Sequence, residues 1–257
     1  MDTDSGAVSC NKIVISGLTA AGKTTHTKLL AHSLGFGTLH FTDILLDELG
    51  VAASKDDQVW FHRFDEVESL REGYSADRRA DDRVADALQS ADPLIVDATL
   101  APWLNRQAVT LNIWIGSDRA SRAWKCVVSR LPGQISTDDS LRLIDEKDNL
   151  TRTYLRRLTG SDYFVDRTIF DIVLDNSHLI AAPTRADADQ GIALFQEVLQ
   201  ATVEYAMFQE SDALGALLDR DDQTQLSCIV FLREPILSGV SFPGPWANGP
   251  VIASRDI

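Results

Sequence analysis

A glycine-rich segment near the N-terminus limits the folds open to this chain more than any other feature. Residues 17–24, with the sequence GLTAAGKT, match the pattern G-x-x-x-x-G-K-[ST]. A β-branched run at 12–16 precedes the segment and is typical of a buried parallel strand, and the apolar residues of 23–34 favour a helix after it. A strand, a glycine-rich turn and a helix in that order predict an α/β fold.

The chemistry of this segment explains its residue types. The two glycines permit a tight loop whose backbone N–H groups converge on phosphate oxygens, and the following helix adds its partial positive charge. Lys23 is expected to bridge the β- and γ-phosphates of ATP, and the Thr24 hydroxyl is expected to bind Mg²⁺. The predicted ATP-binding residues are Gly17, Thr19, Ala20, Ala21, Gly22, Lys23, Thr24 and Thr25.

A second magnesium ligand is predicted at Asp97. This carboxylate ends the apolar run Pro93–Asp97, and ligands of parallel sheets bind at the carboxyl ends of the strands. Asp97 would then hold Mg²⁺ directly or through water. The alternative is a structural role as the N-cap of the helical segment that follows.

The rest of the chain alternates strands with helical segments. Further strands are expected at 38–41, 93–97, 111–115 and 170–175, which predicts a three-layer fold around a largely parallel sheet. A helix is expected from Ser117 to Arg130, a charged helical pair at 137–159 and an amphipathic helix at 184–208. The predicted organisation is a core at 1–183, with a charged helical insertion at about 42–91 and a mobile charged segment at about 130–160. Residues 184–257 form a C-terminal helix and an extension of unknown role, in which 226–232 could be a strand.

Composition limits the cellular environment and the classes of binding partner that are expected. The 257 residues carry a formal charge of −14, which disfavours general affinity for nucleic acid or anionic membranes. The three cysteines are widely spaced and match neither a disulfide framework nor a zinc site. With no secretory signal and no long apolar stretch, the expected location is the cytoplasm. A homodimer is left open.

The motifs together resemble the cytidylate kinase-like family of nucleoside monophosphate kinases. The specific matches are the glycine-rich loop and Phe170–Ser177 (FDIVLDNS), which is similar to the family's closing strand. Looser likenesses lie at 40–45, 77–82, 94–100 and 146–162, so the resemblance runs from Lys12 to about His178. It implies a P-loop kinase fold in which the insertion binds the phosphate acceptor and a lid closes over ATP. The implied acceptor is CMP or a modified pyrimidine nucleotide.

Two residues depart from the family pattern. Thr99 stands where the family commonly has an arginine that contacts the acceptor, and Lys147 stands where a lid arginine is usual. Lysine cannot make the bidentate phosphate contact of arginine. These departures leave room for a modified pyrimidine nucleotide or for another small alcohol or phosphate as the acceptor.

Phosphoryl transfer requires cations around the phosphates, and the expected catalytic residues are Lys23, Arg152 and Arg156. The two arginines are four residues apart on one helix and so face the same way. Their alternative role is to pair with Asp148 on a solvated face.

On the acceptor side the candidates are Asp43, Arg63, Arg78 and Arg79. Arg63 has aromatic neighbours that could stack a base, although Trp60 and Phe64 at a spacing of four also fit the core stripe of a helix. If the acceptor is a hydroxyl, Asp43 is the expected general base and the fourth catalytic candidate, beside the three cations.

Three functions are therefore open. The first is a kinase that makes a nucleoside diphosphate from a pyrimidine monophosphate. The second is a P-loop kinase for the hydroxyl of a non-nucleotide metabolite or antibiotic. The third is an ATP-binding regulatory protein in which the C-terminal extension does the work.

Overall fold

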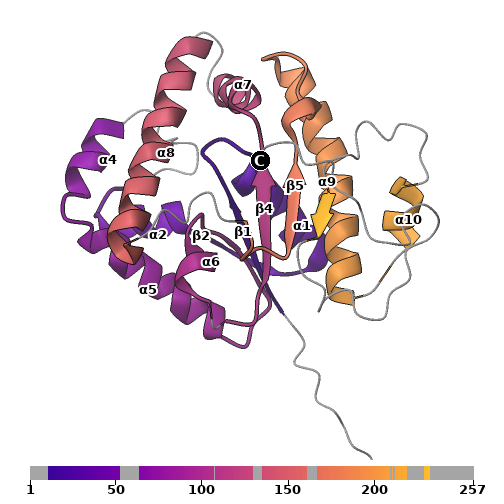
Figure 1. The fold of residues 1–257 in the computed structure, drawn as a ribbon, viewed down its shortest axis with the longest axis horizontal. Helices are drawn as coiled ribbons and strands as arrows, with labels where there is room; N and C mark the ends of the chain where they lie inside the picture. Colours follow the sequence, from indigo (N-terminus) through magenta and orange to yellow (C-terminus); the bar gives the residue numbers. More distant parts are fainter. Residues whose placement is uncertain are drawn as a thin grey trace, which may run out of the picture.

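The chain folds around a single twisted sheet. The computed structural model describes residues 11–52, 64–106, 108–129, 135–160, 167–208, 210, 212–218 and 229–231 (Figure 1). The sheet has the strand order β2-β3-β1-β4-β5-β6. Its strands are β1 Lys12–Gly17, β2 Gly37–His40, β3 Leu94–Asp97, β4 Leu111–Gly116, β5 Ile172–Asp175 and β6 Ile229–Phe231.

Strand β1 lies inside the sheet between β3 and β4 and pairs in parallel with both. All six of its residues are enclosed, as expected for a β-branched central strand. Strands β2 and β5 continue the parallel sheet outward, and β6 joins β5 in antiparallel orientation. The five parallel strands predicted from the sequence are thus confirmed, and β6 lies within the weaker strand signal at 226–232.

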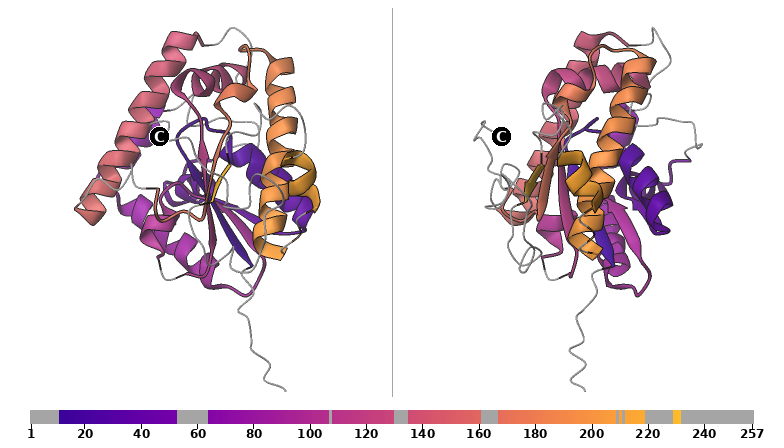
Figure 2. Two further views of the ribbon diagram at one scale, coloured as in Figure 1. Left: turned by 45° about the vertical axis from the view of Figure 1, so that its right-hand side comes forward. Right: turned by 90° about the vertical axis from the view of Figure 1, so that its right-hand side faces the viewer.

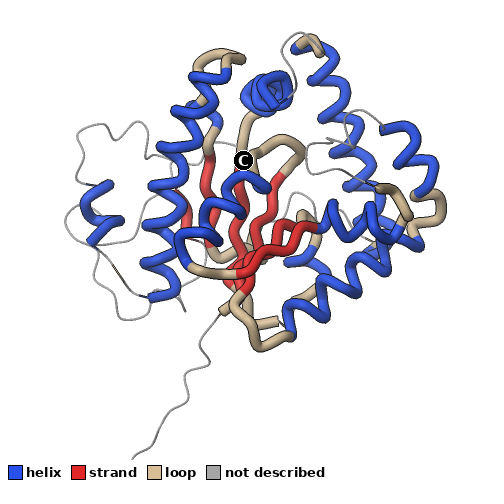
Figure 3. The backbone as a smooth tube through the Cα atoms, turned by 180° about the vertical axis from the view of Figure 1, so that it is seen from behind, coloured by secondary structure: helices blue, strands red, loops and turns tan. Residues whose placement is uncertain are grey.

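Helices cover both faces of the sheet and make three layers (Figures 2 and 3). Helix α1 (Lys23–Leu34), helix α9 (Arg185–Phe208) and helix α10 (Asp212–Leu218) pack on one face. The opposite face is covered by α2 (Phe41–Glu48), α5 (Ser75–Gln89), the short α6 (Ala101–Leu104) and α8 (Thr137–Thr159). Helix α4 (Phe64–Leu70) precedes α5, α7 (Arg119–Ser129) packs on α8, and a 3₁₀ turn, η2 (Ser177–Leu179), follows β5.

The alternation of side chains along the strands separates the two cores. Ile13 and Ile15 of β1 face α1 and α9, whereas Val14 faces α2 and α5. Farther along the second face, Trp114 of β4 packs edge-on against Trp103 and Phe170. Period-two alternation in buried strands therefore builds both layers from one sheet.

One prediction about the helices is wrong. Residues 137–159 form the single helix α8 rather than a helical pair. The Ser136 hydroxyl accepts a hydrogen bond from Asp139 N at 3.0 Å to begin the helix, and Gly160, with φ 70°, ends it. No proline or glycine interrupts the sequence between these caps, so nothing ends the helix within this stretch.

Helix α9 agrees with the predicted amphipathic segment and belongs to the packed layer beside α1. The proposed division of the chain at 183/184 stays a prediction. The Pro- and Gly-rich stretch at 235–248, Arg63 and Trp60 lie outside the described residues, and so do parts of the predicted segment at 130–160. Within the described ranges, no helix is both long and apolar enough to cross a membrane.

Candidate functional site

The loop between β1 and α1 has the backbone form that its glycines predict. Gly17 has φ 154°, and a Cβ there would lie 2.5 Å from the carbonyl oxygen of Ile115. Gly22 has φ 98° and is the N-cap of α1, while Ala20 adopts a positive φ of 62°, a conformation uncommon for a residue with a side chain. Thr19, Ala20, Gly22, Lys23, Thr24 and Thr25 line one large cavity, whereas Ala21 is buried.

Lys23 lies at the centre of this cavity with its side chain folded over the loop. Its Nζ donates a hydrogen bond to the carbonyl oxygen of Leu18 at 3.0 Å. Burial lowers the pKa of Lys23, and the carboxylates of Asp97 and Asp148 oppose that shift. An ammonium group that is poorly solvated and close to the loop amides is well placed to bind a phosphate anion.

Thr24 and Asp97 meet directly. The Thr24 hydroxyl donates a hydrogen bond to Asp97 Oδ2 at 2.5 Å, and His40 Nδ1 lies 3.4 Å from the same oxygen. Burial alone would raise the pKa of Asp97, but His40, Lys23 and Thr24 stabilise the carboxylate and the net shift is downward. The cap of the next helix is Leu100, so Asp97 is not the N-cap that the sequence left open.

These oxygens fit Mg²⁺ as hard ligands. A hydroxyl and a carboxylate in contact at the end of β3 provide the small number of protein oxygens that Mg²⁺ takes when substrate phosphates and water complete its shell. Among the described residues, no group of three or more His, Cys, Asp or Glu side chains could hold a metal ion. With Thr24 and Asp97 as its protein ligands, a magnesium ion at this place would take further oxygens from bound phosphates and water.

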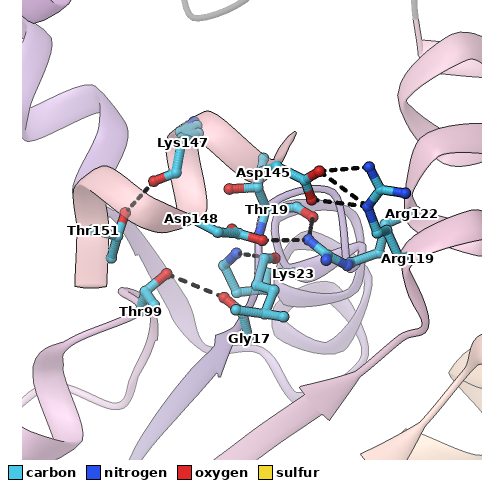
Figure 4. A network of polar contacts seen from close by, with 11 residues as sticks. Gly17, Thr19, Lys23, Thr99, Arg119, Arg122, Asp145, Lys147, Asp148 and Thr151 are labelled. Carbon is cyan, nitrogen blue, oxygen red and sulfur yellow. Dashed lines mark hydrogen bonds and ion pairs between the residues drawn. The ribbon is translucent and has the colours of Figure 1, made fainter. Parts of the chain in front are cut away.

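Asp148 of α8 contacts both the phosphate loop and α7, and its ion pair with α7 was not predicted from the sequence (Figure 4). Asp148 Oδ1 accepts a hydrogen bond from Thr19 N at 2.9 Å, and Asp148 Oδ2 lies 2.6 Å from Arg122 NH1. The same guanidinium donates to the carbonyl oxygen of Thr19 at 3.1 Å. A second pair, Arg119–Asp145, joins the same two helices at the surface. The loop, α7 and α8 thus meet at one buried carboxylate.

The cavity has a volume of about 1230 Å³ and extends to both sides of the loop. We call the part bounded by α1, α7, η2 and α9 the α9 side. Its charged lining residues are the cations Lys125 and Arg185, whereas Lys28 follows Thr24 by one turn of α1 and so lies on the Asp97 face of that helix. Lys125 Nζ donates to Ser117 Oγ at 2.9 Å and also contacts Asn176 Oδ1, and burial lowers the pKa of Lys125 to about 8. Asn176 in turn donates to the carbonyl oxygen of Ala21 at 3.0 Å.

The part bounded by α2, α5 and α8, which we call the α5 side, has a different lining. Carboxylates predominate among its charged residues: Asp43, Asp47, Asp77 and Asp81, with the cations Arg71 and Lys147. Arg71 is 8% exposed and donates from Nε to both oxygens of the fully buried Asp77, at 3.1 and 3.2 Å. It also binds Glu68, so two carboxylates already neutralise this guanidinium.

Lys147 brings a cation from α8 to the middle of the cavity. Burial lowers its pKa to about 7, and the nearby charges of Lys23 and Arg71 act in the same direction. Its neighbour Asp148 fixes this turn of α8 on the loop. Lys147, one of the two residues that depart from the family pattern, is therefore the α8 cation that lines the cavity.

Of the remaining predicted site residues, some line the cavity and others do not. Asp43 is exposed but lines the α5 side, and Thr99 lines it while donating to the carbonyl oxygen of Gly17 at 3.3 Å. Arg78 and Arg79 are exposed and do not line the cavity, and Arg79 pairs with Glu48 on the outside of the insertion.

Arg152 and Arg156 are likewise absent from the cavity lining, and Asp148, their expected partner, is bound to Arg122 instead. Their catalytic roles stay predictions. The role of Arg63 also stays a prediction, because this residue lies outside the described part of the chain.

Several residues of the site are not predicted individually from the sequence. They are Arg71, Arg122, Lys125, Asp148 and Tyr154, and also Asp81, which lies in the segment 77–82 that resembles the family's acceptor-side helix. The available signal was helical spacing: Lys147, Thr151 and Tyr154 are separated by four and three residues and line the cavity together.

Comparison with known proteins agrees with this geometry. A profile of the cytidylate kinase-like family matches residues 12–178. The chain belongs to this family. A cytidylate kinase of Pyrobaculum aerophilum is 28% identical over 167 residues, which cover 65% of this chain and 84% of that protein. A cytidylate kinase of Thermococcus kodakarensis is 26% identical over 172 residues, covering 66% and 81%.

Solved structures of other kinases are more distantly similar to this cytidylate kinase-like chain. A shikimate kinase from Bacteroides thetaiotaomicron has a TM-score of 0.41 at 14% identity, with 74% of this chain and 98% of that chain covered. A gluconokinase from Sinorhizobium meliloti 1021 has a TM-score of 0.39 at 15% identity, covering 73% and 94%.

Proposed function

We propose that this protein transfers the γ-phosphoryl group of ATP to a nucleoside monophosphate, with CMP or a modified pyrimidine nucleotide as the acceptor. The observation that carries the proposal is the contact of Thr24 with Asp97 beside Lys23, at the centre of a cavity that extends to both sides of the phosphate loop. One side can hold the nucleotide that supplies the phosphoryl group and the other the molecule that receives it.

ATP would bind with its phosphates on the loop amides and its base toward the α9 side. The cations Lys23 at the loop and Lys125 on this side line the cavity and match a polyphosphate in charge. Thr24 and Asp97 would hold Mg²⁺, which when bound neutralises phosphate charge. Arg122 is close enough to the loop to exchange part of its contact with Asp148 for a phosphate oxygen.

The acceptor would bind on the α5 side with its phosphate toward Lys23 and Lys147. Family membership and the relatives named cytidylate kinase support a pyrimidine monophosphate. A phosphate oxygen of such an acceptor is already ionised at neutral pH, so the reaction needs positioning and charge neutralisation rather than a strong base. Lys147 on α8 would supply the charge that the family usually takes from a lid arginine.

A non-nucleotide alcohol is the second candidate acceptor. The observation that favours it is the exposed carboxylate of Asp43 in the lining of the α5 side. A hydroxyl acceptor loses a proton during transfer, and a carboxylate within reach could take that proton.

The test is an ADP-release assay with ATP and Mg²⁺. The acceptors to compare are CMP, dCMP, UMP, AMP and the methylated and hydroxymethylated pyrimidine monophosphates, beside a panel of sugar and amino alcohols. ADP release that depends on a pyrimidine monophosphate supports the proposal. Release with an alcohol alone supports the second candidate, and tight ATP binding with no turnover of any acceptor contradicts both.

A further inference from the structure

One face of α8 runs along the cavity and sets a length scale for its occupant. Lys147, Thr151 and Tyr154 all line the cavity from this face. Seven residues separate the first from the last, which corresponds to a rise of about 10 Å along the helix axis. Lys147 lies at the end where Lys23 is, so Tyr154 marks the far end of the α5 side. A nucleoside monophosphate has a comparable extent from its phosphate to the outer edge of its base.

A carboxyl group from the insertion meets α8 at this far end. The Tyr154 hydroxyl donates a hydrogen bond to Asp81 Oδ2 at 2.8 Å. Tyr154 is itself fixed, because its ring is buried and stacks on Tyr74 with a centroid distance of 4.9 Å and an interplanar angle of 24°. Asp81 therefore occupies a defined position rather than one of many rotamers.

Asp81 differs from the neighbouring Asp77 in its remaining hydrogen-bonding capacity. Both oxygens of Asp77 are held by Arg71. Asp81 Oδ1, by contrast, receives no hydrogen bond from the part of the chain that the structure describes, although Asp81 lines the cavity. Asp81 is half-buried and its Oδ1 is open to the cavity, so a ligand that supplies an N–H or O–H group there gains a well-placed contact.

The electrostatics of the pair agree with this geometry. Burial raises the pKa of Asp81 to about 7; the hydrogen bond from Tyr154 opposes the shift, and the charges of Asp77 and Asp82 add to it. A hydrogen-bond donor that approaches the oxygens of such a carboxyl group stabilises its ionised form.

We propose that Asp81, positioned by Tyr154, determines acceptor specificity by accepting a hydrogen bond from an amino group at the end of the acceptor remote from the phosphate. The inference rests on the proposed nucleoside monophosphate kinase function and deepens it. Among pyrimidine monophosphates it selects those that carry an exocyclic amine, the cytosine class. Uracil and thymine present a carbonyl oxygen at that place, which offers no hydrogen to the ionised carboxylate.

The test compares kcat/KM for CMP and UMP in wild-type protein, Asp81→Asn and Tyr154→Phe. A site built around a hydrogen bond rejects analogues that cannot make it. Asp81→Asn, whose amide can donate to a carbonyl, should lower the CMP:UMP ratio at least about tenfold while the KM for ATP stays unchanged. Tyr154→Phe keeps the ring on Tyr74 but releases Asp81, so the ratio should fall less, by about threefold. Asp86→Asn, an exposed change on the same helix outside the cavity lining, is the matched control and should leave the ratio unchanged.

The outcomes separate this inference from the function on which it rests. If wild-type protein turns over both nucleotides and the ratio is the same in Asp81→Asn, the specificity role is wrong and the kinase function stands. Turnover of neither nucleotide by wild-type protein contradicts both.

A measurement on wild-type protein alone covers the case in which the variants do not fold. The monophosphate of 2-pyrimidinone riboside is CMP without its amino group, and its kcat/KM should be at least about tenfold lower than that of CMP. Equal values would contradict the role of Asp81.

Discussion

The two sides of the cavity share the phosphate loop but differ in charge. The α9 side presents Lys125 and Arg185, whereas carboxylates predominate on the α5 side, where Arg71 is already paired with Asp77 and Glu68. A polyphosphate fits the first lining, and a molecule that offers hydrogen-bond donors fits much of the second. The difference teaches that in this chain phosphate recognition is concentrated at the loop and at Lys147. The far α5 side is left to recognise the rest of the acceptor.

The largest effect on activity is expected from the removal of Lys23, the cation of the phosphate loop. Lys23→Ala should lower kcat for ADP release by about 10²–10³-fold, because the variant loses a preorganised positive charge at the transferred group. His32→Ala, an exposed change on the same helix, is the matched control and should keep full activity. Substantial activity in Lys23→Ala would contradict the role of Lys23 and the phosphate loop in phosphoryl transfer.

Lys147 tests whether α8 supplies charge to the α5 side. Lys147→Met should lower kcat by about 10²-fold, and Lys147→Arg should retain most of the activity. Burial lowers the pKa of Lys147 to about 7, so in the free enzyme the ammonium form is lost as the pH rises through 7. The kcat/KM for the acceptor should fall across that range in wild-type protein, and the fall should be absent in Lys147→Arg. An identical pH profile in the two proteins would argue against a charge role.

The buried and exposed ion pairs between α7 and α8 offer a comparison of stability. The side chains of Arg122 and Asp148 are 6% and 16% exposed, against 55% and 39% for Arg119 and Asp145. Arg122→Met removes the ion-pair partner of a largely enclosed carboxylate, which keeps only the hydrogen bond from Thr19 N, and should cost about 3 kcal/mol in the free energy of unfolding. Arg119→Met should cost less than about 1 kcal/mol. Denaturant unfolding of both variants measures the difference, and similar losses would mean that burial of the first pair has no effect.

The smallest expected effect concerns Asp81 without any ligand. Its pKa in the folded protein is raised to about 7 from an ordinary value of 3.8, mainly by burial. The stability linked to its proton is fully present below pH 3.8 and is lost as the pH rises through 7. Asp81→Asn does not titrate, so its melting temperature relative to wild type should increase by a few degrees between pH 5 and pH 8. A constant difference would show that Asp81 ionises normally.

The part of the site that lies in one stretch of sequence was predictable. The phosphate loop was found from its glycines, and Asp97 from its place at the end of an apolar strand; both lie at the site. A parallel sheet brings the carboxyl ends of its strands to one edge, so local patterns were sufficient there.

The α5 side could not be found in this way, because its residues meet only after α5 and α8 pack. Arg78 and Arg79 carried the charge expected of an acceptor site, yet they lie on the exposed face of α5, and Asp77 and Asp81 face inward. Charge alone does not tell the two faces of a helix apart, and the helical spacing of Asp77 and Asp81 was the better guide.

The antiparallel strand β6 has a consequence for how the protein is made. It pairs with β5 although α9 and α10 lie between them in the chain, so this edge of the sheet stays uncovered on the ribosome until late in synthesis. Until then β5 exposes unpaired backbone groups beside the apolar residues Ile172, Val173 and Leu174, a surface that invites pairing with other chains. Chains cut before residue 229 should therefore aggregate more readily than the full-length protein, even though the phosphate loop is intact.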